Sequence, residues 1–294
     1  MLHVQRSCGY AWRPSLRLDA IERLASWLRA EHPELILFVD NCYGELVEEQ
    51  EPCHVGAHLV AGSLIKNPGG TLAPSGGYVA GRADLVAAAS RRLSSPGVEG
   101  GATLGQGRLL FQGLFNAPAV VGEALKGAEL VAHVMSALGY LCNPLPGAAR
   151  TDIIQAVQLG QPEKVVAFCR AVQRNSPVGS HIVPEPGITP GYGDQVIFAD
   201  GTFIDGSTLE LSADGPLREP YAVYVQGCIH WTHWAIVLEA ALTAIQSEGL
   251  SMECTAAASA PAGEGEAAVD GEQDGGHRVY AGRKTLRNSA RREA

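Results

Sequence analysis

The sequence lacks the features of nucleic-acid-binding, secreted and membrane-embedded proteins. Its 22 Lys and Arg residues are outnumbered by 31 Asp and Glu residues, and the net charge of -9 argues against general nucleic-acid binding, which needs a basic surface. It has no run of about 18 uncharged apolar residues, so no membrane span is expected. Residues 1–6 do not join a basic start to an apolar core, so we expect no secretory signal and a cytoplasmic location, with an organelle as the alternative.

Paired cysteines and recognisable ligand clusters are also missing. The seven cysteines are an odd number and include no C-x-x-C pair, which favours free thiols in a reducing compartment. Cys53, His54 and His58 lie close in sequence but lack a fourth ligand at a metal-site spacing, so no metal is predicted. The glycines do not match a dinucleotide-binding fingerprint. With 46% hydrophobic and 18% charged residues, the 294-residue chain has the composition of a globular enzyme.

The apolar patterns that are present indicate an α/β protein. Residues 15–30 carry apolar side chains at helical spacing, and Pro33 ends this helix. Residues 35–39 are apolar on both faces, which is typical of a central parallel strand. The other elements expected in this half are strands over 2–7, 55–61 and 77–81, a helix over 83–93, a glycine- and serine-rich loop over 94–107, and one or two helices over 109–138.

The second half of the chain has a different pattern. Pro144 and Pro146 interrupt the apolar run, and an alternating stretch over 196–212 contains the turn signals Asp200-Gly201 and Asp205-Gly206. Strands that pair through hairpins and are covered by helices form an α+β domain. The other elements expected here are a strand over 152–159, a helix over 162–175, a strand over 221–226 and a helix over 232–247.

These patterns divide the chain into three parts. We predict a large domain of mostly parallel sheet over 1–146 and a C-terminal α+β small domain over 147–253. The segment 254–294 contains mainly Ala, Gly and Glu followed by a basic end, with almost nothing to bury. A segment of this composition is expected to be a disordered, solvated tail.

Two apolar runs end in residues of opposite charge. Asp40 follows the run 35–39, and Lys66 follows the run 59–65 and precedes a glycine-containing turn that would let backbone approach a ligand. An aspartate at the end of a buried strand either lies where open α/β sheets bind ligands or caps the next segment. A buried lysine is expected to have a lowered pKa, which suits imine formation. An acid and an amine together suit pyridoxal phosphate, whose ring nitrogen pairs with a carboxylate.

Longer motifs around these residues resemble a known family. Residues 39–43 resemble the Val-Asp-Asn-Thr-aromatic strand end of the cystathionine γ-synthase and methionine γ-lyase group, and residues 63–66 resemble its Ser-x-Thr-Lys. The resemblance is closer to the methionine γ-lyase-like family that is also named aluminium resistance protein, and it covers about residues 2–246. The segments that carry it are 40–45, 62–70, 109–115 and 210–216.

The resemblance implies a fold and a cofactor. The fold would be type I of the pyridoxal phosphate enzymes, with a partial large domain and an α+β small domain. Lys66 would bind the cofactor and move protons, Asp40 would pair with the pyridine nitrogen, and Ser63 would hydrogen-bond the phosphate; a small residue between strand and loop is the alternative for Ser63. Family members begin with a segment that supplies a phosphate-binding turn. Because this chain starts directly in the strand over 2–7, we expect it to lack its N-terminal part.

Two positions depart from the γ-synthase group. Ile65 replaces a phosphate-binding threonine, and Glu210 stands where that group has the arginine for the substrate carboxylate. Arg218 is then the leading candidate for this carboxylate, because arginine offers a two-point fork. A surface ion pair with Glu219 or another acid is the alternative for Arg218. The further candidates are Arg6 and Arg13.

The resemblance predicts a pyridoxal phosphate-dependent carbon–sulfur lyase that acts on a small sulfur amino acid by β- or γ-elimination. Lys66 would take the Cα proton and Asp40 would keep the ring charged. Two other interpretations stay open: a truncated, inactive relative that acts as a non-enzymatic subunit or binding protein, and an aminotransferase, which uses the same acid and lysine. Fold type I enzymes build their sites at subunit interfaces, so the resemblance also implies a homodimer or homotetramer.

Overall fold

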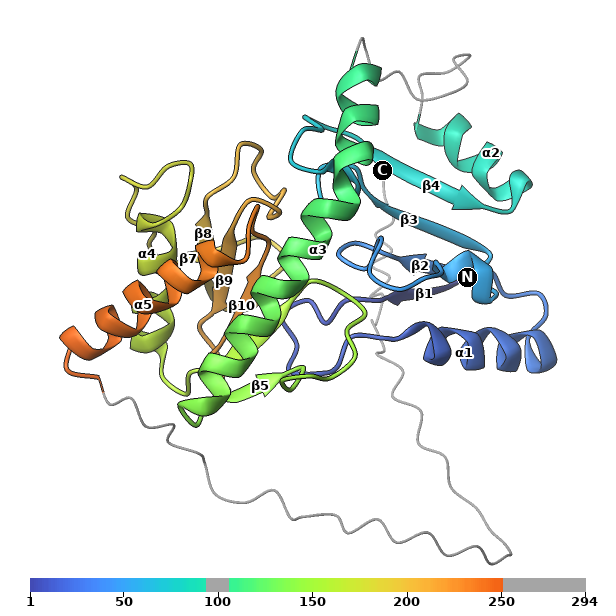
Figure 1. Cartoon of the computed structure of the whole chain (residues 1–294). Helices are drawn as coiled ribbons and strands as arrows, with labels where there is room; N and C mark the ends of the chain where they lie inside the picture. The colour runs from blue at the N-terminus through green and yellow to red at the C-terminus, as the bar shows by residue number, and fades with distance from the viewer. Residues whose placement is uncertain (94–105, 251–294) are drawn as a thin grey trace, which may run out of the picture. The chain divides into compact units, whose positions relative to one another are not determined.

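The computed structural model describes residues 1–93 and 106–250. The predicted tail over 254–294 lies outside these residues, as does most of the predicted loop over 94–107. The described residues form two β-sheets and five α-helices (Figure 1). The predicted α/β class is therefore confirmed, whereas the domain boundary near residue 146 stays a prediction.

The first sheet is mostly parallel. β1, β2 and β3 run parallel to one another, and β4 pairs antiparallel with β3. Leu37 and Val39 of β2 are fully buried, as expected for an apolar central strand. Since β1 to β3 are parallel, their carboxyl ends meet at one edge of the sheet, where ligands bind in α/β proteins. In spatial order the strands are β1 (Leu2–Gln5), β2 (Leu37–Asp40), β3 (Leu59–Ser63) and β4 (Gly77–Gly81).

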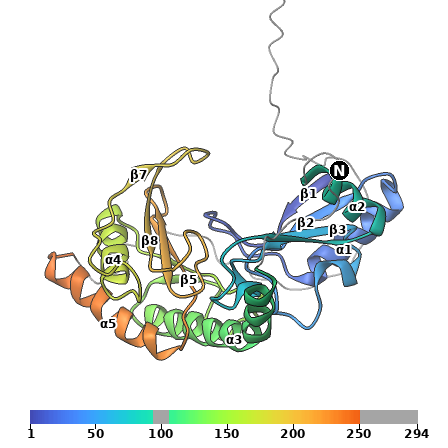
Figure 2. The same ribbon diagram turned by 90° about the horizontal axis from the view of Figure 1, so that it is seen from above.

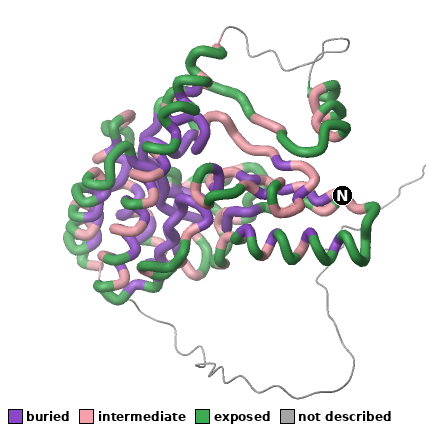
Figure 3. Tube along the Cα trace, turned by 45° about the vertical axis from the view of Figure 1, so that its right-hand side comes forward, coloured by how far each residue is buried: buried purple, intermediate pink, exposed green. Residues whose placement is uncertain are grey.

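Helix α1 (Leu18–Glu31) packs against the first sheet. Its buried residues Leu18, Ile21, Ala25 and Leu28 recur at helical spacing and join one apolar cluster with strands β2 and β3. Figure 3 shows this alternation of buried and exposed residues along α1. The predicted helix is thus confirmed. Helix α2 (Ala83–Leu93) follows β4 and has no buried residue.

The second sheet is antiparallel throughout. Every pair of neighbouring strands in it has antiparallel register. Strands β9 and β10 are buried along their whole length, because helices cover one face and the loop after β1 meets the other. In spatial order the strands are β5 (Leu141–Asn143), β6 (Gln155–Gln158), β10 (Ala222–Gln226), β9 (Ser212–Pro216), β8 (Gln195–Asp200) and β7 (Gly187–Ile188).

Three helices build the largest apolar core together with the second sheet. Met135 of α3 (Gly107–Ala137), Phe168 of α4 (Pro162–Arg174) and Trp234 of α5 (Thr232–Ser247) are buried in it. Helix α3 is continuous although it contains Pro118. It contacts strands β5 and β6 of the second sheet and also the short turn η2 (Asn67–Gly69), which follows Lys66 (Figure 2).

One predicted strand and one predicted alternating stretch differ in extent from the structure. The strand expected over 55–61 begins only at Leu59, because residues 52–55 form a 3-10 turn (η1) that starts with a proline and is closed by a capping box. The alternating stretch expected over 196–212 forms β8 as far as Asp200, and the chain returns from Ser212 as β9, which pairs antiparallel with β8. Asp200 accepts hydrogen bonds from Thr202 Oγ1 and from the amide of Gly206, so its side chain closes the turn that follows β8.

No helix in residues 1–93 or 106–250 is both long enough and apolar enough to cross a bilayer.

Candidate active site

A cavity of about 430 Å³ opens at the carboxyl ends of the parallel strands. Residues that follow β1, β2 and β3 form one wall, and residues of β9 and β10 form the opposite wall. This position follows from the topology, because parallel neighbours deliver their C-terminal residues to the same edge. The cavity has a size usual for small-molecule sites. Four of the sequence-predicted residues line it: Arg13, Asp40, Lys66 and Arg218.

Lys66 follows β3, and its side chain is half-buried in the cavity wall. Its Nζ donates a hydrogen bond to the phenol oxygen of Tyr43 at 2.8 Å and lies 4.0 Å from the centre of that ring. Burial alone lowers the pKa of Lys66, but Tyr43, Cys42 and Asp40 act in the opposite direction, and the pKa lies above its usual value. The expectation of a lowered pKa is therefore wrong, because these partners stabilise the ammonium form.

Asp40 is the last residue of β2. One carboxylate oxygen, Oδ1, accepts a hydrogen bond from the amide of Cys42 at 3.1 Å, so Asp40 fixes the turn that follows its strand. The same side chain lines the cavity and is one of the groups that raise the pKa of Lys66. Asp40 thus has both of the positions that the sequence left open: it closes a local turn and it faces the cavity.

Ser63 is placed differently. It is the last residue of β3, and its Oγ accepts a hydrogen bond from the amide of Ile65 at 3.2 Å. It is not among the described residues that line the cavity. Ser63 therefore does not line the cavity with Asp40 and Lys66, and its predicted phosphate contact stays a prediction.

The three arginine candidates have different surroundings. Arg218 lines the cavity and is 42% exposed; it pairs with Asp194 at 3.3 Å and donates to the carbonyl of Tyr10 at 2.9 Å. The acid that pairs with Arg218 is therefore Asp194 and not Glu219. Arg13 also lines the cavity, but its guanidinium donates to backbone carbonyls of its own loop and of Gln5.

Arg6 lies outside the cavity. Its guanidinium is fully buried and donates to Asn41, Gly44, Glu48 and Thr151. All of these partners belong to the protein itself, so Arg6 connects β1 to the loop after β2 and to Thr151. Arg6 as a candidate for the substrate carboxylate is therefore wrong.

The residues on the opposite wall were not predicted from the sequence. Asp214 of β9 is 8% exposed, and its Oδ2 accepts hydrogen bonds from Tyr10 Oη at 2.8 Å and from Gln226 Nε2 at 3.2 Å. Burial is the main cause that raises the pKa of Asp214 to about 7; Asp200 adds to it, whereas Tyr10 and Lys66 oppose it. In the sequence, Asp214 was indicated only as a member of the segment 210–216, which is one of the segments that resemble the family.

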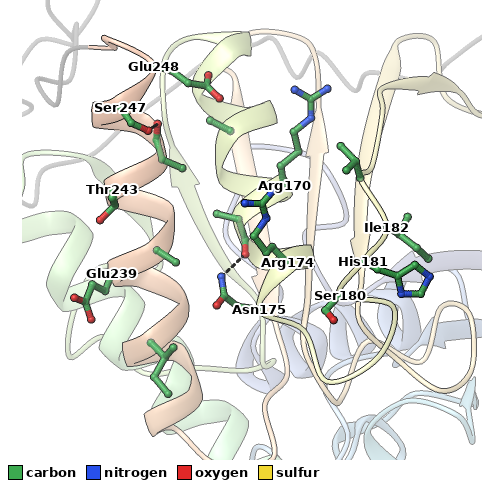
Figure 4. A pocket seen from close by; sticks show the side chains of 16 residues that line it. Arg170, Arg174, Asn175, Ser180, His181, Ile182, Glu239, Thr243, Ser247 and Glu248 are labelled. Carbon is green, nitrogen blue, oxygen red and sulfur yellow. Dashed lines mark hydrogen bonds between the residues drawn. The ribbon is translucent and has the colours of Figure 1, made fainter.

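A larger cavity of about 810 Å³ lies between α4 and α5 (Figure 4). Arg170, Arg174 and His181 line it on one side, with Glu239 on the side of α5. Arg170 is already paired with Glu185 at 2.6 Å. None of the sequence-predicted site residues lines this cavity, so the smaller one is the candidate active site.

Known proteins similar to this chain belong to the same family that its motifs resemble. A family model described as methionine gamma-lyase matches residues 1–246. An uncharacterized protein of Bacillus subtilis (strain 168), YnbB, is 51% identical over 235 residues, which are 79% of this chain and 56% of that protein. This chain therefore spans little more than half the length of that relative.

Two solved structures are similar in both sequence and fold. One, from Listeria monocytogenes, is named as a candidate cystathionine beta-lyase involved in aluminum resistance; it is 48% identical, with a TM-score of 0.78 over 83% of this chain and 60% of that chain. The other, from Clostridium novyi NT, is named as a carbon-sulfur lyase involved in aluminum resistance; it is 44% identical, with a TM-score of 0.76 over 83% of this chain and 57% of that chain. The resemblance seen in the sequence is thus confirmed, and the chain belongs to the methionine gamma-lyase family.

Proposed function

We propose that this chain is the catalytic part of a pyridoxal phosphate-dependent carbon–sulfur lyase that acts on a sulfur amino acid by β- or γ-elimination. The observation that carries the proposal is the cavity shared by Lys66 and Asp40, which come from the ends of two neighbouring parallel strands. The names of the Listeria and Clostridium relatives support the reaction class. This chain spans less than two thirds of either protein, so the activity of a whole enzyme is part of the proposal.

The donor groups in the cavity fit this cofactor. Lys66 offers an amine for its aldehyde, and Asp40 offers a carboxylate for its ring nitrogen. The side chains of Tyr10, Tyr43 and Tyr224 give the cavity aromatic walls, which suit a flat ring. When bound, pyridoxal phosphate supplies the electron sink that stabilises negative charge at the substrate Cα.

The protein residues would divide the remaining work. Lys66 Nζ would accept the Cα proton and return it later, which requires its neutral form. Burial holds the pKa of the Tyr43 phenol above its usual value, so Tyr43 stays neutral and can accept from the ammonium or donate to the amine. Asp40 would hold a proton on the ring nitrogen. Arg218 would bind the substrate carboxylate in exchange for its present partner Asp194.

Borohydride trapping tests the proposal. The purified chain is incubated with pyridoxal phosphate, reduced and digested, and the modified peptides are identified by mass spectrometry. We expect the label at Lys66 and its loss in Lys66→Arg. Lys126→Arg is the matched control, because Lys126 lies on the exposed side of α3 and pairs only with Glu123 among the described residues. A chain without label at Lys66, or with equal label at Lys66 and Lys126, would contradict the proposal and favour a non-enzymatic role.

Product analysis separates the remaining alternatives. A lyase releases a thiol, ammonia and a keto acid from S-alkyl amino acids, whereas an aminotransferase transfers the amino group to the cofactor and makes a keto acid that keeps the carbon–sulfur bond. We also propose that the active protein is a homodimer or homotetramer, which light scattering of the labelled chain would measure.

A further inference from the structure

Asp214 is a buried carboxylate on the cavity wall opposite Lys66 and Asp40. It lies on β9, and both of its hydrogen bonds, from Tyr10 and from Gln226, reach the same oxygen, Oδ2. Within residues 1–93 and 106–250, Asp214 has no ion pair and Oδ1 has no hydrogen-bond donor. A carboxylate this deeply buried is stabilised by a cation, and Oδ1 is the oxygen that the two donors leave free.

The cations that line the cavity already have other partners. Lys66 donates to Tyr43, Arg13 donates to backbone carbonyls, and Arg218 pairs with Asp194. Lys66 acts on Asp214 only through space, where it lowers the pKa of the carboxyl. The cavity thus presents an acidic group that the described part of the chain leaves without a counter-charge.

One end of the substrate in the proposed reaction has no assigned partner yet and can contact Asp214. Its amino group reacts next to Lys66, and its carboxylate is repelled by Asp214 and attracted by Arg218. The part that can extend toward Asp214 is therefore the substituent on sulfur. A buried carboxylate that is held by two donors selects a positively charged nitrogen over an apolar group of the same size.

We propose, on the basis of the proposed lyase function, that Asp214 binds an ammonium group on the sulfur substituent of the substrate. The site would then prefer sulfur amino acids whose thiol leaving group carries a positive charge. Tyr10 and Gln226 are positioning residues in this subsite, because they fix the carboxylate through Oδ2.

Protonation of Asp214 gives the subsite a pH dependence. Its pKa is raised to about 7, chiefly by burial, so the empty subsite is largely protonated below neutral pH and ionised above it. The ionisable groups that act on Asp214, or that it acts on, are Tyr10, Tyr43, Lys66, Cys169 and Asp200. Because an ammonium binds the carboxylate form, its affinity should rise as the pH increases through about 7.

Two ligands of equal length test the proposal. S-(2-aminoethyl)-L-cysteine ends in an ammonium, and S-propyl-L-cysteine ends in a methyl group. Isothermal titration calorimetry measures both, with the chain alone and with the chain loaded with pyridoxal phosphate. We expect the aminoethyl compound to bind about ten-fold more tightly, and we expect Asp214→Asn to remove the preference. Asp84→Asn removes one carboxylate charge from exposed α2, away from the cavity, and should keep the preference for the aminoethyl compound.

The outcomes distinguish the subsite from the lyase function. Equal affinities in the unmodified chain, or a preference that survives in Asp214→Asn, would overturn the subsite. If Asp214→Asn does not fold, the pH dependence of the preference is measured in the unmodified chain. The preference should shrink when the pH is lowered from about 8 to about 5.5. A constant preference would overturn the proposal. A preference without any label at Lys66 would reject the lyase function only, and a label at Lys66 without a preference would reject the subsite only.

Discussion

The amine of Lys66 and the phenol of Tyr43 form a hydrogen-bonded pair, with Nζ 2.8 Å from the phenol oxygen and 4.0 Å from the ring centre. Tyr43 has a left-handed backbone conformation, with φ of 73°, in the turn after β2. This turn brings the ring under the lysine that follows the next strand. The charge state of the candidate catalytic lysine therefore depends on a residue from the neighbouring strand.

Replacing Tyr43 should change the basicity of Lys66. Tyr43→Phe keeps the ring but removes the oxygen that accepts the hydrogen bond, so the ammonium form loses stability and the pKa of Lys66 should fall. More of the reactive free amine is then present at neutral pH, and pyridoxal phosphate should attach about ten-fold faster. The rate of borohydride-trapped attachment between about pH 7 and pH 10 measures this change.

Tyr192→Phe is the control for this experiment. Tyr192 lines the same cavity and packs on Tyr10, and among the described residues it makes no hydrogen bond to Lys66. Its pH profile should match that of the unmodified chain. An unchanged profile in Tyr43→Phe would show that the phenol oxygen does not control the protonation of Lys66.

Two glycines of α3 should respond in opposite ways to alanine. Gly113 touches the turn that follows Lys66, and a Cβ there would lie 2.2 Å from the carbonyl oxygen of Gly69. Gly122 on the same helix has no atom within 4 Å of its added Cβ. Gly113→Ala should lower the free energy of unfolding by about 1–3 kcal/mol, since backbone would have to move. Gly122→Ala should raise it by about 0.5–1 kcal/mol through helix propensity.

Urea unfolding of the two variants checks this pair. The approach of backbone to a ligand at the glycines after Lys66 stays a prediction. A Cβ on Gly70 would lie 2.2 Å from the carbonyl oxygen of Gly113, so this glycine also lets the turn approach α3. Equal stabilities of Gly113→Ala and Gly122→Ala would mean that the turn is not pressed against the helix.

Burial of Arg6 should make it far more important for stability than for catalysis. Arg6→Ala removes four hydrogen-bond partners and the ion pair with Glu51, and it leaves Glu48 without its buried cation. We therefore expect a loss of about 3–5 kcal/mol in the free energy of unfolding. Arg23→Ala removes an exposed arginine that pairs with Asp19 four residues away, and should have little effect. Chemical denaturation compares them, and similar stabilities would contradict the role given to Arg6.

The sequence contained enough information to place Asp40 and Lys66 together. Both follow apolar runs, and neighbouring parallel strands bring their carboxyl ends to one edge whatever the details of packing. The same logic identified α1 and the central strand β2, because each has a regular apolar pattern. These features depend on local periodicity, which a single sequence shows.

The other parts of the site depend on contacts between distant segments. Tyr10 and Asp214 are 204 residues apart, and Arg6 and Thr151 are 145 residues apart. No periodicity links such pairs, so neither the subsite at Asp214 nor the burial of Arg6 could be derived. The pKa of Lys66 was predicted in the wrong direction for the same reason: burial was visible in the apolar run, but the phenol that offsets it was not.

Glu45 should give the folded chain a stability that falls as the pH rises. Its side chain is 4% exposed, Oε1 accepts a hydrogen bond from Tyr78 Oη at 2.9 Å, and Oε2 has no partner in the described part of the chain. Burial is the main cause that raises the pKa of Glu45 from 4.5 to about 7. Between these two values the unfolded chain has released the proton and the folded chain still holds it, so the free energy of unfolding decreases with increasing pH.

Glu45→Gln should remove this part of the pH dependence, because glutamine resembles the protonated acid and does not ionise. From the shift between 4.5 and about 7, the unmodified chain should lose on the order of 3 kcal/mol between about pH 5 and pH 8 through this group alone. Guanidinium unfolding at the two pH values measures the difference. The raised pKa values of Asp214, Asp152 and Glu210 act in the same direction, so Glu45→Gln should keep a smaller slope. A slope in Glu45→Gln equal to that of the unmodified chain would mean that Glu45 is ionised in the folded state at neutral pH.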